Sequence, residues 1–269
     1  MPAADALLAA AVGAAADELV AEVDRAGWPI ERALGLLASL SAEIAGQREL
    51  VEVAARRLGP IAGDRIARMA GALADLEAAL VAHAPELESE LKLRLRPLRE
   101  QWEARGPGML LHVARQTEEQ LIPASAEGVL TAPYTGGFGL AHASTNRFLL
   151  EAVLVNPLPE LPEAVRIAWL VCHLNAELPR YAEATSTLPA AERIVPLAAL
   201  PAALAAAEYV ELAACNEATV AAALEAWRVP GASPALAATL WQWWSLYLDG
   251  ATSWPAATAA LEQMLAPGE

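Results

Sequence analysis

The sequence predicts a mainly α-helical protein of the α+β class, with a helical N-terminal bundle followed by a small β-sheet flanked by helices. Both ends of the 269-residue chain are rich in alanine and carry apolar residues at i, i+3 and i+4 spacing, which is typical of amphipathic helices. Glycine and proline divide these segments into separate helices. Only the stretch from about 123 to 156 has the short apolar runs and turn residues of strands.

The first domain is predicted to span residues 1–105. Breaks at 27–29, 59–60 and 84–85, where glycine or a proline interrupts the helical pattern, divide it into four helices. Each helix has one apolar stripe, so the helices are expected to pack as a bundle. The apolar and basic residues alternate as in a strand over 91–96, but the residues on both sides favour a helix.

The second domain, 106–269, is predicted to begin with the break at Gly106-Pro107-Gly108 and a short helix at 109–120. Strands are expected near 128–132 and 147–155, with the glycine-rich segment 134–139 as a loop between them. An apolar helix should follow at 159–178. The chain beyond 190 is predicted to be helical, with breaks at its prolines.

The composition narrows the classes of partner. The formal charge of −15 argues against nucleic acid and anionic membrane surfaces, because both attract basic proteins. The apolar N-terminus has no basic segment ahead of it, so we expect an amphipathic helix rather than a signal peptide, and no charge-free run is long enough for a membrane span. Cys172 and Cys215 form neither a zinc-binding pattern nor a disulfide framework, which favours the cytoplasm.

Two histidines are candidate metal ligands. His142 precedes the longer predicted strand, and His173 lies in the predicted helix 159–178, with Glu177 one turn later on the same face. Imidazole and carboxylate groups that converge from different elements are what a metal site requires. Two candidate ligands are weak evidence, however, and a hydrogen-bonded structural role is favoured for both histidines.

A strand that runs into an apolar helix resembles the core of zincin-type metallopeptidases, in which that helix carries the motif HExxH. The corresponding residues here are Trp169-Leu170-Val171-Cys172-His173. Only His173 matches, because Trp169 stands at the first ligand and Leu170 at the general base. The resemblance implies a third ligand on a later helix, where Glu208 and Glu211 are the positional equivalents. With one imidazole and the base replaced, zinc affinity and base catalysis should collapse.

The densest aromatic cluster is a candidate interface. Trp241, Trp243 and Trp244 lie within one predicted helix, and tryptophan is enriched in binding hot spots. Because Leu240, Trp244 and Tyr247 share one helical face, the pattern favours a role in the core over a role in binding. The glycine-rich loop has neither the spacing nor the lysine of a nucleotide-binding motif, and the chain has no GxSxG nucleophile motif.

We therefore expect a non-catalytic intracellular scaffold or protein-binding protein, a degenerate zincin-like pseudo-enzyme that binds a protein partner or itself. We expect it to have no cofactor and no catalytic residue. The alternative is a metal-dependent hydrolase that uses His142, His173 and a glutamate to hold zinc. A third hypothesis is a small-molecule binder that uses the glycine loop and the tryptophans.

Overall fold

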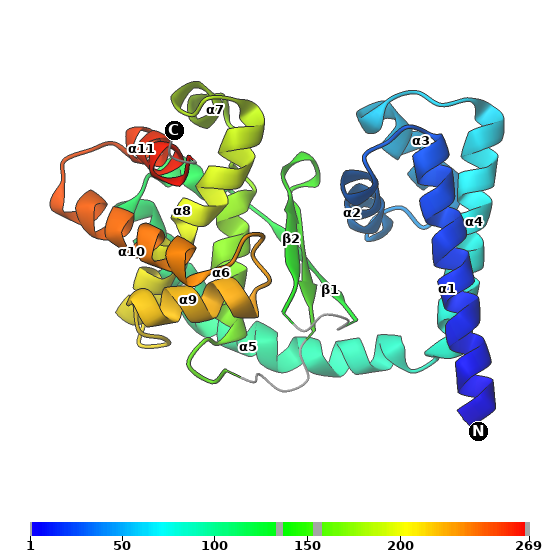
Figure 1. The fold of residues 1–269 in the computed structure, drawn as a ribbon. Coiled ribbons are helices and arrows are strands. Elements are labelled where there is room, and N and C mark those ends of the chain that lie inside the picture. Colours follow the sequence, from blue (N-terminus) through cyan, green and yellow to red (C-terminus); the bar gives the residue numbers. More distant parts are fainter. Residues whose placement is uncertain (1, 133–136, 153–157, 267–269) are drawn as a thin grey trace. The chain divides into compact units, whose positions relative to one another are not determined.

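The computed structural model describes residues 2–132, 137–152 and 158–266 (Figure 1). It is mainly α-helical with one small sheet, as predicted from the sequence. The chain forms two compact units, Met1–Lys92 and Leu93–Glu269. The division lies inside a long helix, whereas we expected a domain boundary near Arg105.

The first unit is a bundle built by α1 (Pro2–Arg25), α2 (Ile30–Ser41), α3 (Gln47–Leu58) and α4 (Gly63–His83). Its core contains Leu36, Leu40, Val51 and Met69. We predicted one helix between 30 and 58, but the chain leaves the helix after Ser41 and starts again with an extended residue at Gly46. No proline marks this break, so the helical spacing alone did not reveal it.

Helix α5 (Leu87–Gln116) is the long helix that crosses the division between the units. It runs without interruption through 91–96 and through Gly106-Pro107-Gly108, where we predicted a break. The side chain of Trp102 lies over Gly106, so a Cβ atom there would be only 2.5 Å from the indole ring. The glycine therefore serves close packing inside the helix instead of ending it.

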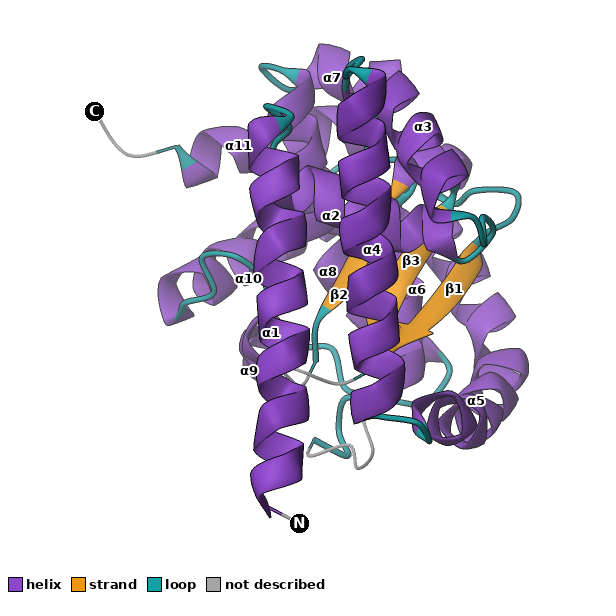
Figure 2. Cartoon of the chain, turned by 90° about the vertical axis from the view of Figure 1, so that its right-hand side faces the viewer, coloured by secondary structure: helices purple, strands orange, loops and turns teal. Residues whose placement is uncertain are grey.

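The second unit contains a three-stranded sheet in the order β1-β3-β2, whose strands lie side by side in Figure 2. Strand β1 (Glu127–Thr131) is parallel to β3 (Arg147–Glu151), and β2 (Gly139–His142) is antiparallel to β3. The two predicted strands are thus confirmed within the described residues, while 153–155 lie outside them. Strand β2 was not predicted, because it begins at Gly139, the last residue of the segment that its glycines marked as a loop, and continues only to His142.

Glycine at two positions allows the sheet to approach the neighbouring helices. A Cβ atom at Gly139 would lie 2.7 Å from the side chain of Leu170, and one at Gly137 would lie 1.9 Å from the carbonyl oxygen of Ala226. Gly137 also has a φ of +117°, which side chains disfavour. Both described glycines of this segment are therefore required for packing.

Six helices complete the second unit, namely α6 (Glu163–His173), α7 (Pro179–Ala184), α8 (Leu188–Tyr209), α9 (Glu217–Ala226), α10 (Pro234–Asp249) and α11 (Trp254–Leu265). Side chains of Thr187, Asn216 and Ser233 cap the starts of α8, α9 and α10, which supplies partners for exposed backbone amides. Helix α6 is shorter than the predicted 159–178. Helix α8 continues through Pro196 and Pro201, where we predicted breaks.

Helix α8 is the centre of the second unit's core. Most of its residues are buried, and α6 packs along it. Within the described ranges it is also the one helix with the length and hydropathy that a membrane span requires, but 78% of its most apolar window is covered by the protein. Such coverage is typical of the core helix of a folded domain.

Candidate functional site

The segment that resembles HExxH is packed with aromatic rings. On α6, the indole of Trp169 stacks on Trp227 with ring centroids 5.1 Å apart, and it forms a T-shaped contact with the ring of His173 at 4.3 Å. The indole nitrogen of Trp169 donates a hydrogen bond of 2.9 Å to the carbonyl oxygen of Pro196. Trp169 therefore fills the space beside His173 and is fixed there from two sides.

Leu170, at the position of the zincin general base, is 0% exposed and packs against Gly139. It thus holds the sheet against α6. Its neighbour Cys172 is also buried, and its Sγ donates to the carbonyl oxygen of Ala168. Burial raises the pKa of the Cys172 thiol to about 12, so the thiol remains protonated and unreactive.

His142 and His173 share an unusual feature. The Nε2 atom of each is buried, and neither Nε2 atom has a hydrogen-bond partner within the part of the chain that the structure describes. Burial lowers the pKa of His142 to about 4 and that of His173 to about 3, so both imidazoles are neutral at pH 7. A neutral imidazole can bind a metal, but it also fits an apolar core.

The three candidate glutamates do not complete a metal site. Glu177 is exposed in the turn beyond α6, so His173 and Glu177 do not share a helical face as we predicted. Glu208 is exposed, and its carboxylate accepts a hydrogen bond of 3.0 Å from the backbone amide of Cys215. Glu211 is exposed in a left-handed turn after α8. Among the described residues, no three His, Cys, Asp or Glu side chains gather closely enough to hold a metal ion.

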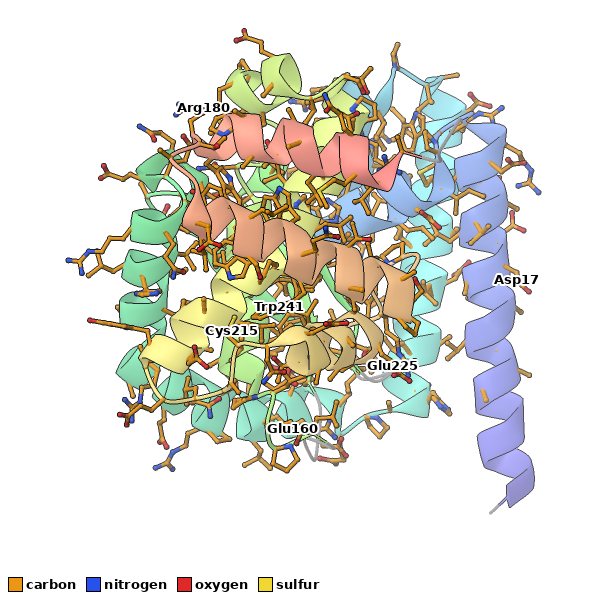
Figure 3. All side chains as sticks on the ribbon, turned by 60° about the vertical axis from the view of Figure 1, so that its left-hand side comes forward. Asp17, Glu160, Arg180, Cys215, Glu225 and Trp241 are labelled. Atoms are coloured by element: carbon orange, nitrogen blue, oxygen red, sulfur yellow. The ribbon has the colours of Figure 1, made fainter. Side chains whose placement is uncertain are left out.

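The tryptophan cluster belongs mostly to the core. Trp243 and Trp244 are buried, where they pack with Tyr247 and Trp254. The indole nitrogen of Trp243 donates to the carbonyl oxygen of Ala257 at 2.8 Å. These two tryptophans are thus not available as an interface. Trp241, labelled in Figure 3, is the one member of the predicted interface that is partly exposed.

A buried charged network connects the sheet to α6. The Arg166 side chain is 0% exposed and forms an ion pair with Glu163. Its guanidinium donates to the carbonyl oxygens of Phe138 at 3.1 Å and Glu151 at 2.9 Å. The Oε2 atom of Glu151 accepts the backbone amides of Gly137 at 2.7 Å and Phe138 at 2.9 Å. The amides of the glycine segment therefore bind a carboxylate of the protein itself.

Burial shifts the pKa values of two charged groups in this network, Glu163 and Arg166. It raises the pKa of Glu163, although the adjacent Arg166 opposes that change. It also lowers the pKa of Arg166, against the attraction of Glu163 and Glu151. Sequence reasoning did not identify this group. The available signal was that a charged residue follows three apolar residues in the predicted strand, Glu151, and that another, Arg166, lies among the apolar residues of the following helix.

A pocket of about 220 Å³ lies beside this network, within the second unit. It is found at the carboxyl ends of the parallel strands β1 and β3, the edge of a parallel pair at which ligands generally bind. The residues that line it come from α5, β1, β3 and α6: Arg94, Pro97, Leu98, Gln101, Leu130, Glu151, Ala152 and Glu163.

A second feature of this unit is an exposed apolar surface, which we call the Tyr209 surface and define by Leu111, His112, Tyr209 and Val210. Tyr209 is 62% exposed and Leu111 is 53% exposed. The rings of His112 and Tyr209 are stacked at 4.3 Å. Val210 contacts α5 closely, since a Cβ atom at Gly108 would lie 3.3 Å from it. These contacts join the end of α8 to α5.

Comparison with known proteins adds no functional assignment, because no protein-family model, no curated protein and no solved structure matches this chain.

Proposed function

We propose that this protein is a non-catalytic protein-binding protein and that the Tyr209 surface is where it binds. The observation that carries the proposal is the exposure of two large side chains, Tyr209 and Leu111, on segments held together by the stacked ring of His112. A large aromatic residue on a rigid support is typical of an interface centre. Exposed Glu208 and Glu211 flank Tyr209 and Val210 in the sequence, and exposed Arg115 interacts electrostatically with His112; charged residues beside an apolar centre are typical of protein interfaces.

The contacts of α6 support the non-catalytic part of the proposal. A zincin-like hydrolase needs a carboxylate at position 170 and a second imidazole at position 169. Leu170 instead packs the sheet against α6, and Trp169 lies between Trp227 and His173. Both side chains therefore stabilise the fold at the positions where catalytic groups would have to be.

The net charge favours a different protein as partner over a second copy. The chain carries a formal charge of −15, so two copies repel each other at long range. A partner with less acidic charge avoids this repulsion. We therefore expect a distinct protein that covers Tyr209 and Leu111 with an apolar patch of its own.

Site-specific photo-crosslinking tests this proposal. A photoreactive amino acid replaces Leu111 in the full-length protein, expressed in the cells in which the protein naturally occurs. We expect one defined adduct to a different protein, identified by mass spectrometry, and we expect Tyr209→Ser to weaken it. The matched control places the same group at Leu246, which is 60% exposed on α10. The same adducts at both positions, an adduct that Tyr209→Ser leaves unchanged, or only self-adducts would contradict the proposal.

The metal-dependent hydrolase is the second candidate, and one observation favours it. The buried Nε2 atoms of His142 and His173 have no hydrogen-bond partner among the described residues, and such atoms are suited to a metal ion. The positions of the glutamates support a metal-dependent hydrolase less well. Glu177, Glu208 and Glu211 are all exposed, in the turn after α6, near the end of α8 and in the turn after α8. Metal analysis distinguishes the two candidates.

A further inference from the structure

The pocket at the carboxyl ends of β1 and β3 is lined by both polar and apolar residues. The polar residues supply two carboxylates, those of Glu151 and Glu163, with one guanidinium, that of Arg94, and the amide of Gln101. The apolar residues are Pro97, Leu98, Leu130 and Ala152. A ligand of this pocket should thus carry one polar group and a short aliphatic part.

The positive charges near the pocket already have protein partners. Arg94 uses its Nη1 atom to donate a hydrogen bond of 2.8 Å to the carbonyl oxygen of Ala152. Arg166 does not line the pocket, and its two Nη atoms are bonded to Phe138, Glu151 and Glu163. The guanidinium groups are therefore poorly placed to receive a ligand carboxylate.

Acceptor atoms, in contrast, are available among the polar residues that line the pocket. Glu163 forms its ion pair through Oε2, and its Oε1 atom has no hydrogen bond within the described part of the chain. The side-chain amide of Gln101 likewise makes no hydrogen bond there. Both side chains line the cavity from different helices, α6 and α5.

We propose that this pocket binds a small aliphatic amine in its protonated form. Its ammonium group donates to the carboxylate of Glu163 and to the amide oxygen of Gln101. Its carbon chain lies along Leu98 and Leu130. The volume of about 220 Å³ is below the roughly 300–1,000 Å³ of pockets for drug-sized ligands, so the ligand has only a few carbon atoms.

Titration of the full-length protein with n-butylammonium, followed by NMR or calorimetry, tests the charge of the ligand. We expect saturable binding of one molecule per chain, and we expect neither n-butanol nor pentanoate to bind comparably. Pentanoate and n-butanol have the same aliphatic character but an anionic or uncharged head group. Binding of pentanoate in preference, or no saturable binding of n-butylammonium, would overturn the proposal.

Substitutions then test the position of the site. Glu163→Gln keeps the shape of the side chain and removes its charge, so we expect the Kd of n-butylammonium to rise about tenfold or more, because hydrogen bonds to charged groups are the strong ones. The control is Glu160→Gln, an equal change of net charge at an exposed position three residues earlier (Figure 3). That control should change the Kd less than about twofold, since exposed charges contribute little.

A third variant keeps the test decisive if Glu163→Gln disturbs folding. Gln101→Trp fills the pocket from α5 and leaves the pair of Glu163 and Arg166 intact, so n-butylammonium binding should be lost while the circular dichroism spectrum stays unchanged. Equal weakening by Glu163→Gln and Glu160→Gln, or undiminished binding to folded Gln101→Trp, would place the amine elsewhere and overturn the proposal.

Discussion

The imidazole of His173 meets the indole of Trp169 edge to face, with ring centroids 4.3 Å apart. Both residues lie on α6, one helical turn apart, at the two positions that carry metal ligands in the zincin pattern. One ring therefore occupies the space in which the other would coordinate a metal. The neighbouring positions on α6 have equally structural roles, and this has consequences that can be measured.

The first prediction concerns Leu170, which is 0% exposed. Leu170→Glu restores the carboxylate of the zincin motif, but it places a charge against Gly139 without a partner. We expect it to lower the free energy of unfolding by about 3–5 kcal/mol, the typical cost of an uncompensated buried charge. Urea unfolding followed by tryptophan fluorescence measures this, since only Trp28 of the 8 tryptophans lies outside the second unit.

The control for this prediction is Leu246→Glu, the same substitution at a leucine that is 60% exposed. It should change the free energy of unfolding by no more than about 0.5 kcal/mol. If both variants are equally stable, Leu170 is not buried as described, and the structural role assigned to it is wrong.

The second prediction concerns the ion pair of Arg166 and Glu163. Arg166→Met leaves Glu163 without its cation and also removes donors from the carbonyls of Phe138 and Glu151. We expect a loss of about 3–5 kcal/mol in the free energy of unfolding. Replacing both residues, with Arg166→Met and Glu163→Leu together, should cost less than Arg166→Met alone because no charge is then stranded. The control is Arg193→Gln, which removes an exposed arginine. If the effects of Arg166→Met and Glu163→Leu on the free energy of unfolding add up in the double variant, the two residues are not coupled and the prediction is contradicted.

The third prediction concerns acid stability. Burial lowers the pKa of His173 from 6.5 to about 3, so below pH 6.5 the unfolded chain binds a proton that the folded chain does not. The free energy of unfolding should therefore be highest above pH 6.5 and fall steadily as the pH decreases toward 3. In His173→Phe this pH dependence should be shallower. His83→Gln, at an exposed position in the first unit, should keep the wild-type slope, and an unchanged slope in His173→Phe would refute the burial of a neutral imidazole.

The fourth prediction contrasts two helical glycines. A Cβ atom at Gly106 would lie 2.5 Å from Trp102, whereas at Gly71 on α4 it would meet nothing within 4 Å. Gly106→Ala should therefore destabilise the second unit by about 1–3 kcal/mol through overpacking. Gly71→Ala should stabilise the first unit by about 0.5–1 kcal/mol through its helix propensity. Thermal unfolding by circular dichroism measures both, and a stable Gly106→Ala would show that Trp102 does not cover this glycine.

Glycine can end a helix, or it can make room for a neighbouring side chain, and the sequence alone does not distinguish the two roles. This limited which parts of the fold could be predicted. Periodic apolar spacing and proline breaks correctly indicated helices on both sides of a small sheet. Gly106-Pro107-Gly108 also looked like a break, because the packing of Trp102 on Gly106 depends on side-chain placement. Strand β2 was missed for a similar reason, since Gly139 is required by Leu170 rather than by a turn.

The candidate site was harder to predict than the fold. Helical spacing placed Trp244 on a core-facing stripe, but it could not show that Trp243 is also buried. Trp243 lies in the core because its indole finds a hydrogen-bond partner there, the carbonyl oxygen of Ala257. The pairing of His173 with Glu177 depended on a helix that in fact ends at His173. The network around Arg166 joins residues far apart in the chain, and such proximity arises only from tertiary packing.

Zinc content is the most direct test of the claim that α6 has a structural role. Purified full-length protein and His173→Ala are dialysed against zinc, then against buffer, and analysed by mass spectrometry of the metal. We predict that neither protein retains stoichiometric zinc, because Trp169 fills the space beside His173. Retention of about one zinc ion per chain by the wild type, lost in His173→Ala, would contradict this account and establish a metal site at α6.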